Sequence, residues 1–420
     1  MTAIEFFDRT PIENIVSALT IAPKKIIFIG DKSLMEKSKE KYKKFIAKRK
    51  LEIELDFQPI IKNQLNNIVE VLSRIVETED ECVFDLTGGE ELVFVAIGIV
   101  SQKYKDKNIQ LQRFNVNNGR VTDCDYDGQV IYTGDPEITV EECINLHGGF
   151  IRYEKNDDDR TYKWETDGDF VNDVKNLWEE CRKDPGRWNT RLNVLSSVDE
   201  LYKPKGLETS YHVPTLVDFM KRNNDKYISL GGFLKYLEKN KYIFNLTEDG
   251  ENISFRYKND QIKRCLTQAG TILELRVLVS AREVVDKKSK RPCYNDSMSG
   301  VYIDWDGQFH ERGEAEKDTE NEIDVILMKG ITPLFISCKN GKVDDDELYK
   351  LEAVTNRFGG EFAKKYLIAT YLNKKKDSME YFKQRAEDMN IVLVDNVHTL
   401  EPTAFDKVIR NLINLQAKNS

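Results

Sequence analysis

The chain has 420 residues, of which 40% are hydrophobic and 32% charged, a composition typical of two or three folded domains rather than of disorder. Its net charge of −9 excludes a surface that attracts nucleic acid as a whole, so a polyanion must be bound by local basic patches or through metal ions. No apolar run is long enough to cross a bilayer, and the seven cysteines form no CxxC pair, so we expect a soluble cytoplasmic protein without a membrane partner, a zinc site or disulfides.

The first 156 residues alternate predicted strands with predicted helices. The strands are expected at 24–30, 51–60 and 82–89, and the helices at 33–50, 63–77 and 90–104. This alternation is typical of a parallel sheet with helices on both faces. The last helix, EELVFVAIGIVSQKY, is apolar along most of its length, so we expect it to be largely buried. Asn-Gly and Asp-Gly pairs then predict a hairpin over 113–133.

The pattern changes between 157 and 260. Two short helices, at 216–223 and 231–240, precede a hairpin over 242–259, and this order resembles a winged helix. Such a fold often binds DNA, but the second helix carries few residues that could contact bases. The segment is therefore either a DNA-binding unit or an interdomain connector or dimerisation piece.

The part from 261 onwards has the order helix, three strands, helix, strand, helix, strand, which is typical of a compact α+β domain. We predict one continuous helix over 265–284. The strands are expected at 301–309, 320–330, 331–341, 364–372 and 391–395, and the further helices at 344–360 and 378–389. The acids that open the helix at 344 and the glycines that close it at 360 support its limits.

Two of these strands carry polar residues that share a side. Glu322 and Asp324 are two residues apart on one strand, and Ser337 and Lys339 are two apart on the next, so each pair points to one face. A charged group at the end of a buried strand is costly unless it is paired or bound to a metal. An ion pair between Asp324 and Lys339 would by itself satisfy both residues.

Two acids on predicted helices favour a metal site over that simple ion pair. Glu352 lies on the apolar stripe of the helix at 344–360, and Glu274 has isoleucine and leucine neighbours. Several carboxylates together with a lysine suit Mn²⁺ or Mg²⁺, which prefer oxygen ligands. The metal would polarise a phosphodiester and activate a water molecule, while the lysine would steady or activate the nucleophile.

The segments NEIDV, LFISCKNG and ELYKLEAVTNRFGG resemble the CARF-domain nucleases of type III CRISPR systems, ancillary effectors of antiviral defence with a PD-(D/E)xK domain. The resemblance implies an α/β protein with a Rossmann-like CARF domain with a central parallel sheet at 1–156, a winged-helix-like connector at 157–260 and a restriction-endonuclease-like α+β domain at 261–420. It also implies that a cyclic oligoadenylate, with cyclic tetra-adenylate favoured, binds at the axis of a homodimer and activates metal-dependent cleavage of RNA or DNA.

The resemblance assigns the candidate catalytic residues by position. Asp324 matches the first metal-binding aspartate of the family, Lys339 matches the motif lysine, and Glu274 matches the acid on the preceding helix. The metal ion, Mn²⁺ or Mg²⁺, is then expected at Asp324, Glu322 and Cys338.

One position departs from the family pattern. Ser337 stands where the family usually has an acid two residues before the lysine, and a hydroxyl is a poorer Mg²⁺ ligand than a carboxylate. Glu322 or Glu352 is the candidate for supplying the missing oxygen. If neither does, the protein is a ligand-sensing regulator with a catalytically silent nuclease fold. Slow degradation of the ligand by the N-terminal domain would be an activity added to either function.

The N-terminal ligand is expected at the turn that follows the strand at 82–89. Thr87, Gly88 and Gly89 would present backbone N–H groups and a helix N-terminus to an anion, and CARF domains carry a similar glycine-rich turn. Glu90 and Glu91 come next, where a basic or neutral side chain would suit phosphates better, and we interpret them as complementing the helix dipole. The second expected contact is the loop after the first predicted strand, which consists of Gly30, Asp31, Lys32 and Ser33.

Overall fold

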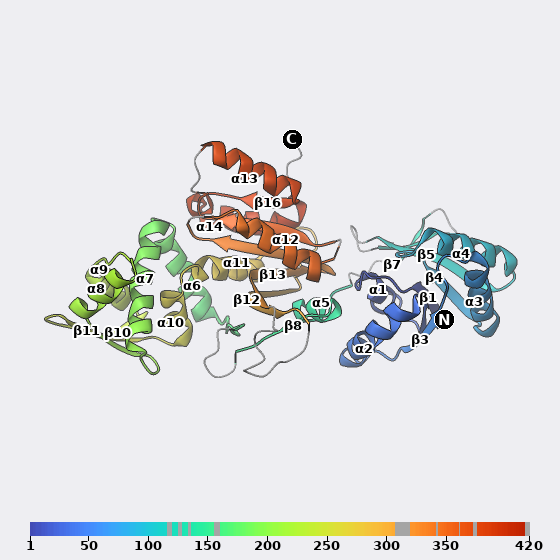
Figure 1. Cartoon of the computed structure of the whole chain (residues 1–420), viewed down its shortest axis with the longest axis horizontal. Coiled ribbons are helices and arrows are strands. Elements are labelled where there is room, and N and C mark those ends of the chain that lie inside the picture. Colours follow the sequence, from blue (N-terminus) through green and yellow to red (C-terminus); the bar gives the residue numbers. More distant parts are fainter. Residues whose placement is uncertain are drawn as a thin grey trace.

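The computed structural model describes residues 1–115, 120–124, 128–132, 136–154, 160–306, 320–341, 343–360, 362–372 and 376–415. Three sheets are arranged along an elongated molecule (Figure 1). The sheet of the N-terminal part lies at one end, the sheet of the C-terminal part lies in the middle, and a small sheet of the middle segment lies at the other end. No helix in the described part of the chain is long and apolar enough to span a membrane.

The N-terminal sheet has seven strands, five parallel and two antiparallel. In pairing order they are β3 (Glu54–Pro59), β2 (Lys25–Gly30), β1 (Thr2–Phe6), β4 (Glu81–Asp85), β5 (Asn108–Asn115), β6 (Arg120–Asp123) and β7 (Val130–Tyr132). The antiparallel strands β6 and β7 confirm the predicted hairpin, whose turns at 116–119 and 125–127 lie outside the described residues. The central strand β1 is not among the predicted strands.

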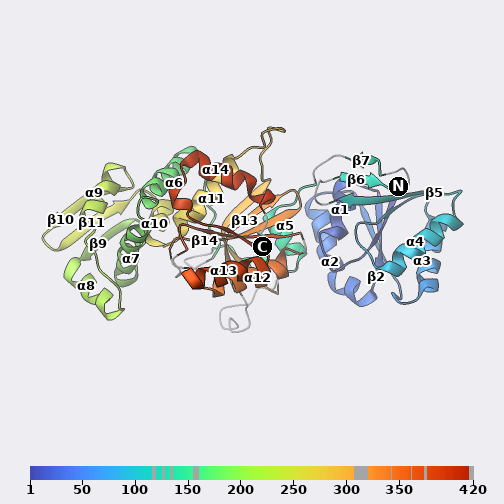
Figure 2. The same cartoon turned by 90° about the horizontal axis from the view of Figure 1, so that it is seen from above.

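Helices cover both faces of this sheet, as the strand–helix alternation predicts (Figure 2). One face packs against α1 (Glu13–Thr20) and α2 (Lys32–Lys48), and the other against α3 (Leu65–Thr78) and α4 (Glu91–Lys103). Successive residues of β1 point to opposite faces of the sheet: Ala3 packs with α1 and α2, and Ile4 packs with α3 and α4. The Rossmann-like prediction is therefore confirmed.

Helix α4 is not largely buried, so that expectation was wrong. Val93, Ala96, Ile97 and Val100 are buried against the sheet, whereas Val95 is 48% exposed and Ile99 42% exposed. The physical reason is that α4 lies in the outer layer, where only one face of a helix can contact the sheet. Its apolar outer face, formed by Leu92, Val95 and Ile99 with Phe94 beside them, is consequently turned away from the chain's own core.

The segment after the N-terminal sheet leads directly into the C-terminal sheet. Helix α5 (Val140–Leu146) begins with a complete capping box formed by Thr139 and Glu142. The short strand β8 (Phe150–Ile151) then pairs with a strand of the C-terminal sheet, Ile151 opposite Ile303. One buried cluster runs through both sheets, so the two parts pack against each other.

The C-terminal sheet has six strands and agrees with the predicted α+β arrangement. In pairing order they are β16 (Ile391–Val394), β15 (Lys364–Ala369), β14 (Thr332–Lys339), β13 (Glu320–Lys329), β12 (Asp296–Asp304) and β8. The strands β12, β13 and β14 are antiparallel, and β14, β15 and β16 are parallel. One face packs against α11 (Thr271–Glu283) and α14 (Pro402–Asn411), and the other against α12 (Asp346–Phe358) and α13 (Lys376–Asp388). Two short 3-10 turns, at Val397–Thr399 and Leu412–Asn414, flank α14.

The helix predicted over 265–284 is two helices, so that prediction was wrong. Helix α10 (Asp260–Thr267) ends before Gly270, which has φ +96° and starts α11. A backbone conformation with positive φ interrupts a helix, and glycine adopts it without steric cost. The break places Glu274 in the first turn of a new helix.

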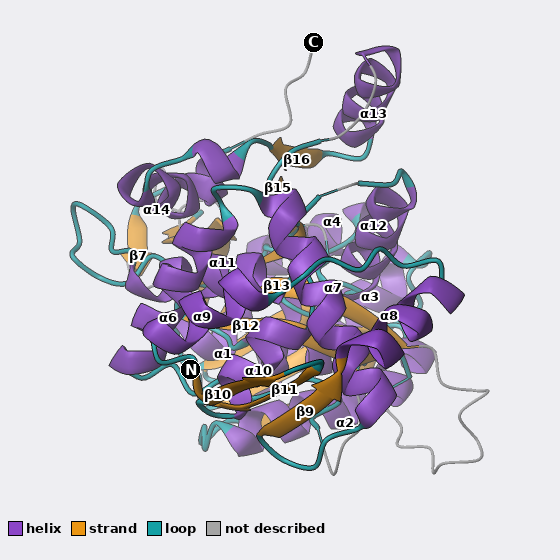
Figure 3. Cartoon of the chain, turned by 90° about the vertical axis from the view of Figure 1, so that its left-hand side faces the viewer, coloured by secondary structure: helices purple, strands orange, loops and turns teal. Residues whose placement is uncertain are grey.

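The middle segment combines helices with a three-stranded sheet (Figure 3). The strands pair in the order β10 (Ile243–Asp249), β11 (Asn252–Tyr257) and β9 (Glu208–His212). The helices are α6 (Gly168–Cys181), α7 (Pro185–Tyr202), α8 (Val213–Arg222) and α9 (Gly231–Lys239). Two helices followed by a hairpin confirm the winged-helix-like prediction, and α6 and α7 share one buried cluster with α11 of the C-terminal part.

Candidate functional site

The candidate active site begins where β13 and β14 part. Their pairing covers Val325–Lys329 and Thr332–Ile336, so Asp324 is the first residue of β13 beyond that ladder. Its Oδ2 accepts a hydrogen bond at 2.6 Å from the backbone N–H of Cys338. Burial raises the pKa of Asp324, and the charge of Lys339 together with this hydrogen bond offsets part of the rise. The residue is therefore a largely buried carboxylate, 16% exposed, that depends on neighbouring positive charge.

Lys339 supplies the nearest positive charge. Its Nζ lies 3.6 Å from Asp324 Oδ2 and 2.8 Å from Glu347 Oε2, and a quarter of the side chain is exposed. Burial alone would lower the pKa of Lys339, but the two carboxylates raise it above its ordinary value. The ammonium group is consequently positively charged at neutral pH and held between two acids. Glu347 is a member of the site that the sequence did not single out, because acids in a first helical turn are common.

Glu274 approaches the same place from α11. Burial raises the pKa of Glu274 well above its ordinary value, and the charges of Asp324 and Glu322 raise it further, while Lys339 lowers it. No hydrogen-bond donor to its carboxyl group is found among the described residues. The structure thus brings together Glu274, Glu322, Asp324 and Lys339, which are four of the predicted site residues.

These residues fit a divalent cation by the chemistry of their donors. A largely buried carboxyl group whose pKa is raised by a neighbouring carboxylate is stabilised by a cation between the two. Glu274 meets this description with Asp324 as its neighbour, and the exposed carboxylate of Glu322 raises the pKa of Glu274 as well. In the side-chain arrangement of the described residues, no three His, Cys, Asp or Glu groups already form a metal-ligand set.

Ser337 and Cys338 occupy different surroundings. The Ser337 hydroxyl donates a hydrogen bond to Asp324 at 3.2 Å, so it supports that carboxylate where the family has a second acid. The Cys338 thiol packs in the core cluster with Leu334 and Ile336, and burial raises its pKa well above the ordinary value. Cys338 therefore contacts the site through its backbone N–H.

Glu352 is placed away from the cluster by its own partners. Its Oε2 forms an ion pair with Lys365 of β15, and its Oε1 accepts a hydrogen bond at 2.9 Å from Asn356. Both partners lie outside the group around Asp324. Of the two candidates for the oxygen missing at Ser337, Glu322 is thus the one that the structure brings close.

A cavity of about 620 Å³ lies at the predicted N-terminal ligand site. Thr87, Gly88 and Gly89 line it, together with residues that the sequence did not indicate: Asp8, Thr10, Glu13, Leu86, Phe94, Arg113 and Cys124. Asp85 stabilises the turn, because its Oδ1 accepts a hydrogen bond at 2.8 Å from the Thr87 backbone N–H. A Cβ on Gly88 would lie 2.6 Å from Glu13 Oε2, so a larger residue there would displace the Glu13 side chain, which lines the cavity.

The loop predicted as the second ligand contact does not line this cavity. The Asp31 side chain instead caps α2, where it accepts a hydrogen bond at 2.9 Å from Leu34 N. Gly30 lies against Phe7, whose Cβ would be 3.0 Å from a glycine Cβ. Neither Lys32 nor Ser33 is among the residues that line the cavity. Glu90 forms an ion pair with Lys62 at 2.6 Å, so its charge is already matched.

The fold and the two sites define a protein in which a Rossmann-like domain is joined to a nuclease-type domain. Residues 253–408 match the family described as Card1-like, endonuclease domain. The endonuclease part of the resemblance inferred from the sequence is thus confirmed over these residues. None of the curated proteins matches the chain.

Solved structures share the fold over nearly the whole chain. The crystal structure of protein VC1899 from Vibrio cholerae aligns with a TM-score of 0.73 and 18% identity, covering 98% of this chain and 97% of that one. Can2 from Sulfobacillus thermosulfidooxidans, in complex with cyclic tetra-adenylate, aligns with a TM-score of 0.64 and 16% identity over 99% and 97%. A type III CRISPR defence DNA nuclease activated by cyclic oligoadenylate aligns with a TM-score of 0.50 and 12% identity, over 89% of this chain and 46% of that one.

Proposed function

We propose that this protein is an endonuclease that requires a divalent metal ion and is activated by a cyclic oligoadenylate in type III CRISPR defence. The observation that carries the proposal is the group formed by Glu274, Asp324 and Lys339 within the part of the chain that matches an endonuclease domain. The scissile bond is a phosphodiester of RNA or DNA.

Glu274, Glu322 and Asp324 would hold the metal ion, Mn²⁺ or Mg²⁺. The ion would supply Lewis-acid stabilisation of the phosphodiester and a water molecule of lowered pKa. Lys339, whose raised pKa keeps it charged, would attract the phosphodiester anion and orient the attacking water. Glu347 and Asp324 would hold the ammonium group in that position.

Cyclic tetra-adenylate is the activator that we propose, and the N-terminal cavity is where it would bind. Two observations support this assignment. The cavity opens at the glycine-rich turn, where backbone N–H groups and the N-terminus of α4 favour a phosphate. Can2, which shares the fold, is described in complex with this compound. Arg113 on β5 is the cationic side chain that lines the cavity among the described residues.

The proposed active form is a homodimer joined through α4. Exposed apolar surface concentrated on one helix marks an interaction site more often than isolated exposed residues do. Leu92, Val95 and Ile99 lie on the outer face of α4, and this helix begins beside the cavity. A two-fold axis near α4 would place two cavities side by side, matching the internal symmetry of a cyclic ligand.

A cleavage assay tests the nuclease assignment. Labelled single-stranded RNA and DNA are incubated with Mn²⁺ or Mg²⁺, with and without cyclic tetra-adenylate. Asp324→Asn and Lys339→Ala should each reduce the cleavage rate about a hundredfold or more, because each removes a charge from the reacting centre. Asp225→Asn and Lys239→Ala, which change exposed residues of the middle segment, should cleave like the wild type. Equal rates in all four variants would refute the site.

The regulator with a silent nuclease fold is the second candidate. Its support is that Ser337, Cys338 and Lys339 already satisfy Asp324, as a purely structural ion pair would. This candidate predicts that the protein binds cyclic tetra-adenylate and cleaves nothing with either metal. Metal-dependent cleavage that needs Asp324 would eliminate it.

A further inference from the structure

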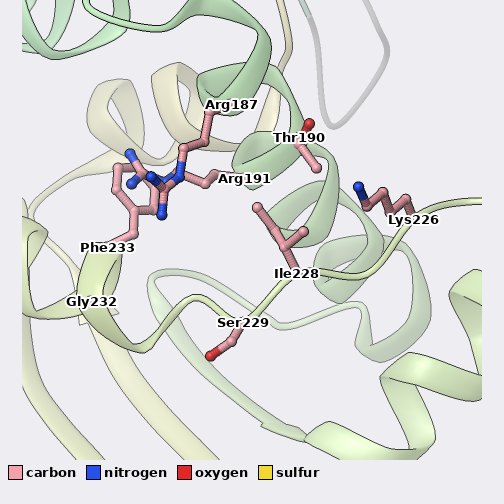
Figure 4. Close-up of a pocket in the computed structure, with 8 residues that line it drawn as sticks. All are labelled: Arg187, Thr190, Arg191, Lys226, Ile228, Ser229, Gly232 and Phe233. Atoms are coloured by element: carbon pink, nitrogen blue, oxygen red, sulfur yellow. The ribbon is translucent and has the colours of Figure 1, made fainter.

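A second cavity, of about 480 Å³, lies in the middle segment (Figure 4). Its walls come from the first turns of α7, the loop between α8 and α9, and the start of α9. We call it the α7–α9 cavity. The residues that line it are Arg187, Thr190, Arg191, Lys226, Ile228, Ser229, Gly232 and Phe233. Its volume is in the range of pockets that hold one small ligand group.

The lining of the α7–α9 cavity is strongly cationic. Three of its residues are basic, none is acidic, and no ion pair of Arg187 or Lys226 is found among the described residues. Arg191 is oriented by the Phe233 ring, 4.7 Å from its guanidinium carbon, and lies 3.5 Å from Glu180. Because the chain as a whole carries a charge of −9, a cavity lined by three basic residues and no acidic one is a marked local exception. Such a cavity selects an anion.

Backbone donors point to the chemistry of that anion. Helix α9 starts at the cavity, and no side chain caps its first N–H groups. A Cβ on Gly232 would meet no atom within 4 Å, so the backbone there is open to a ligand. Arginine and lysine side chains combined with uncapped helix N–H groups form a phosphate site.

Helix α7, which carries Arg187, Thr190 and Arg191 of the cavity, is tied to the candidate active site. Asn189 of α7 donates a hydrogen bond through Nδ2 to the backbone oxygen of Asn340, and Asn340 Nδ2 donates one back to Asn189 Oδ1 at 2.8 Å. Asn340 directly follows Lys339 in the chain. A nucleic-acid strand that reached Lys339 would therefore pass along the N-terminal end of α7.

We propose that the α7–α9 cavity binds a backbone phosphate of the single-stranded nucleic acid that the nuclease domain cleaves. This assignment rests on the proposed function for the identity of the substrate. A single strand suits the site because its phosphates can enter a concave pocket, whereas a duplex presents its backbone on a convex surface. The middle segment thus acts as a substrate-holding unit, and its electrostatic contacts are independent of base sequence.

The experiment measures binding without cleavage. Fluorescence anisotropy of labelled single-stranded RNA and DNA of mixed sequence is recorded for the full-length protein in EDTA at several salt concentrations. The test variant is Arg187→Glu/Lys226→Glu. The matched control, Lys205→Glu/Lys239→Glu, makes the same charge change at exposed lysines that do not line the cavity. Arg187→Gln/Lys226→Gln is a milder pair, and melting temperatures show whether each variant is folded.

We expect the test pair to raise the Kd about tenfold or more relative to the control pair. The slope of log K against log salt should become shallower by about 0.7 for each phosphate of the single strand that the variant no longer neutralises. Equal Kd values for the test and control pairs, or no binding by the wild type, would overturn the proposal. Cavity-dependent binding without any metal-dependent cleavage would leave the cavity assignment standing and refute the proposed nuclease. If the wild type cleaves with metal and Arg187→Glu/Lys226→Glu has the same Kd and cleavage rate as the wild type, the nuclease assignment stands and the cavity assignment is refuted.

Discussion

Replacing Glu5 by glutamine should change how the stability of this protein depends on pH. Glu5 lies on the central strand β1, is 3% exposed, and neither of its carboxyl oxygens has a hydrogen-bond partner in the described part of the chain. Asp85 is its neighbour across the ladder to β4. Burial raises the pKa of Glu5 well above its ordinary value, and the charge of Asp85 raises it further. The folded protein therefore binds a proton at Glu5 that the unfolded chain has already released at the same pH.

The sign and size of the effect follow from that proton. A carboxyl group titrates at about pH 4.3 in an unfolded chain. Above that pH, and up to the raised pKa of the folded state, folding must take up the proton, so the free energy of unfolding falls as pH rises. The loss is about 1.4 kcal/mol for each pH unit in this window. Glutamine does not titrate, so Glu5→Gln should lack this contribution and gain stability relative to the wild type as pH rises.

The measurement is urea unfolding between pH 4 and pH 8 on the wild type and Glu5→Gln. The control is Glu70→Gln, which changes an exposed glutamate of α3 and should keep the wild-type slope. The difference in unfolding free energy between Glu5→Gln and the wild type should grow by about 1.4 kcal/mol per pH unit from about pH 4.3 up to the raised pKa of Glu5, and level off above it. A difference that stays constant over this range would show that Glu5 is ionised in the folded protein, and the reasoning from burial would be wrong.

Three further predictions concern the two sites and the dimer. Glu347→Gln removes the carboxylate 2.8 Å from Lys339 Nζ, so the pKa of Lys339 should fall and the cleavage rate should drop about tenfold, measured as kcat at neutral and alkaline pH. An unchanged pH–rate profile would contradict the role of Glu347. Gly88→Val obstructs the N-terminal cavity beside Glu13 and should abolish stimulation by cyclic tetra-adenylate while basal metal binding, followed by calorimetry, is retained; full stimulation would rule the turn out. Val95→Glu/Ile99→Glu places charges on the outer face of α4 and should convert a dimer to monomers in light scattering, and a dimer that persists would exclude this face.

The members of the candidate active site were largely accessible to sequence reasoning. Glu322 and Asp324 share a strand face, and Lys339 closes an apolar run, so their positions follow from the two-residue period of a strand. Glu274 stood out because it lies among apolar neighbours, and the structure brings it to Asp324. Glu352 had the same signal, but its partner is Lys365 on β15, and only the packing of α12 decides between these two acids.

Other features could not be read from local patterns. Strand β1 contains the buried Glu5, which breaks the apolar alternation that identifies a strand. The outer face of α4 has the same composition as its inner face, so apolarity alone does not distinguish a core surface from an interaction surface. The loop that begins at Gly30 follows β2, and the turn at Thr87 follows β4. Both strands pair with β1, so the loop and the turn leave the sheet at the same end, yet only the turn lines the cavity.

The sequence by itself determined many of the strands and helices, because the periods of strands and helices and the turn residues act over short stretches of chain. It also determined the chemistry, because carboxylates and a lysine in apolar segments must converge on a compensating charge. Only the tertiary structure decided which distant groups meet: Glu347 with Lys339, Asp8 and Glu13 with the glycine-rich turn, and Arg187 with Lys226. The physical reason is that these meetings depend on how helices and loops pack over the sheets, and contacts between residues far apart in the chain leave no period in the sequence.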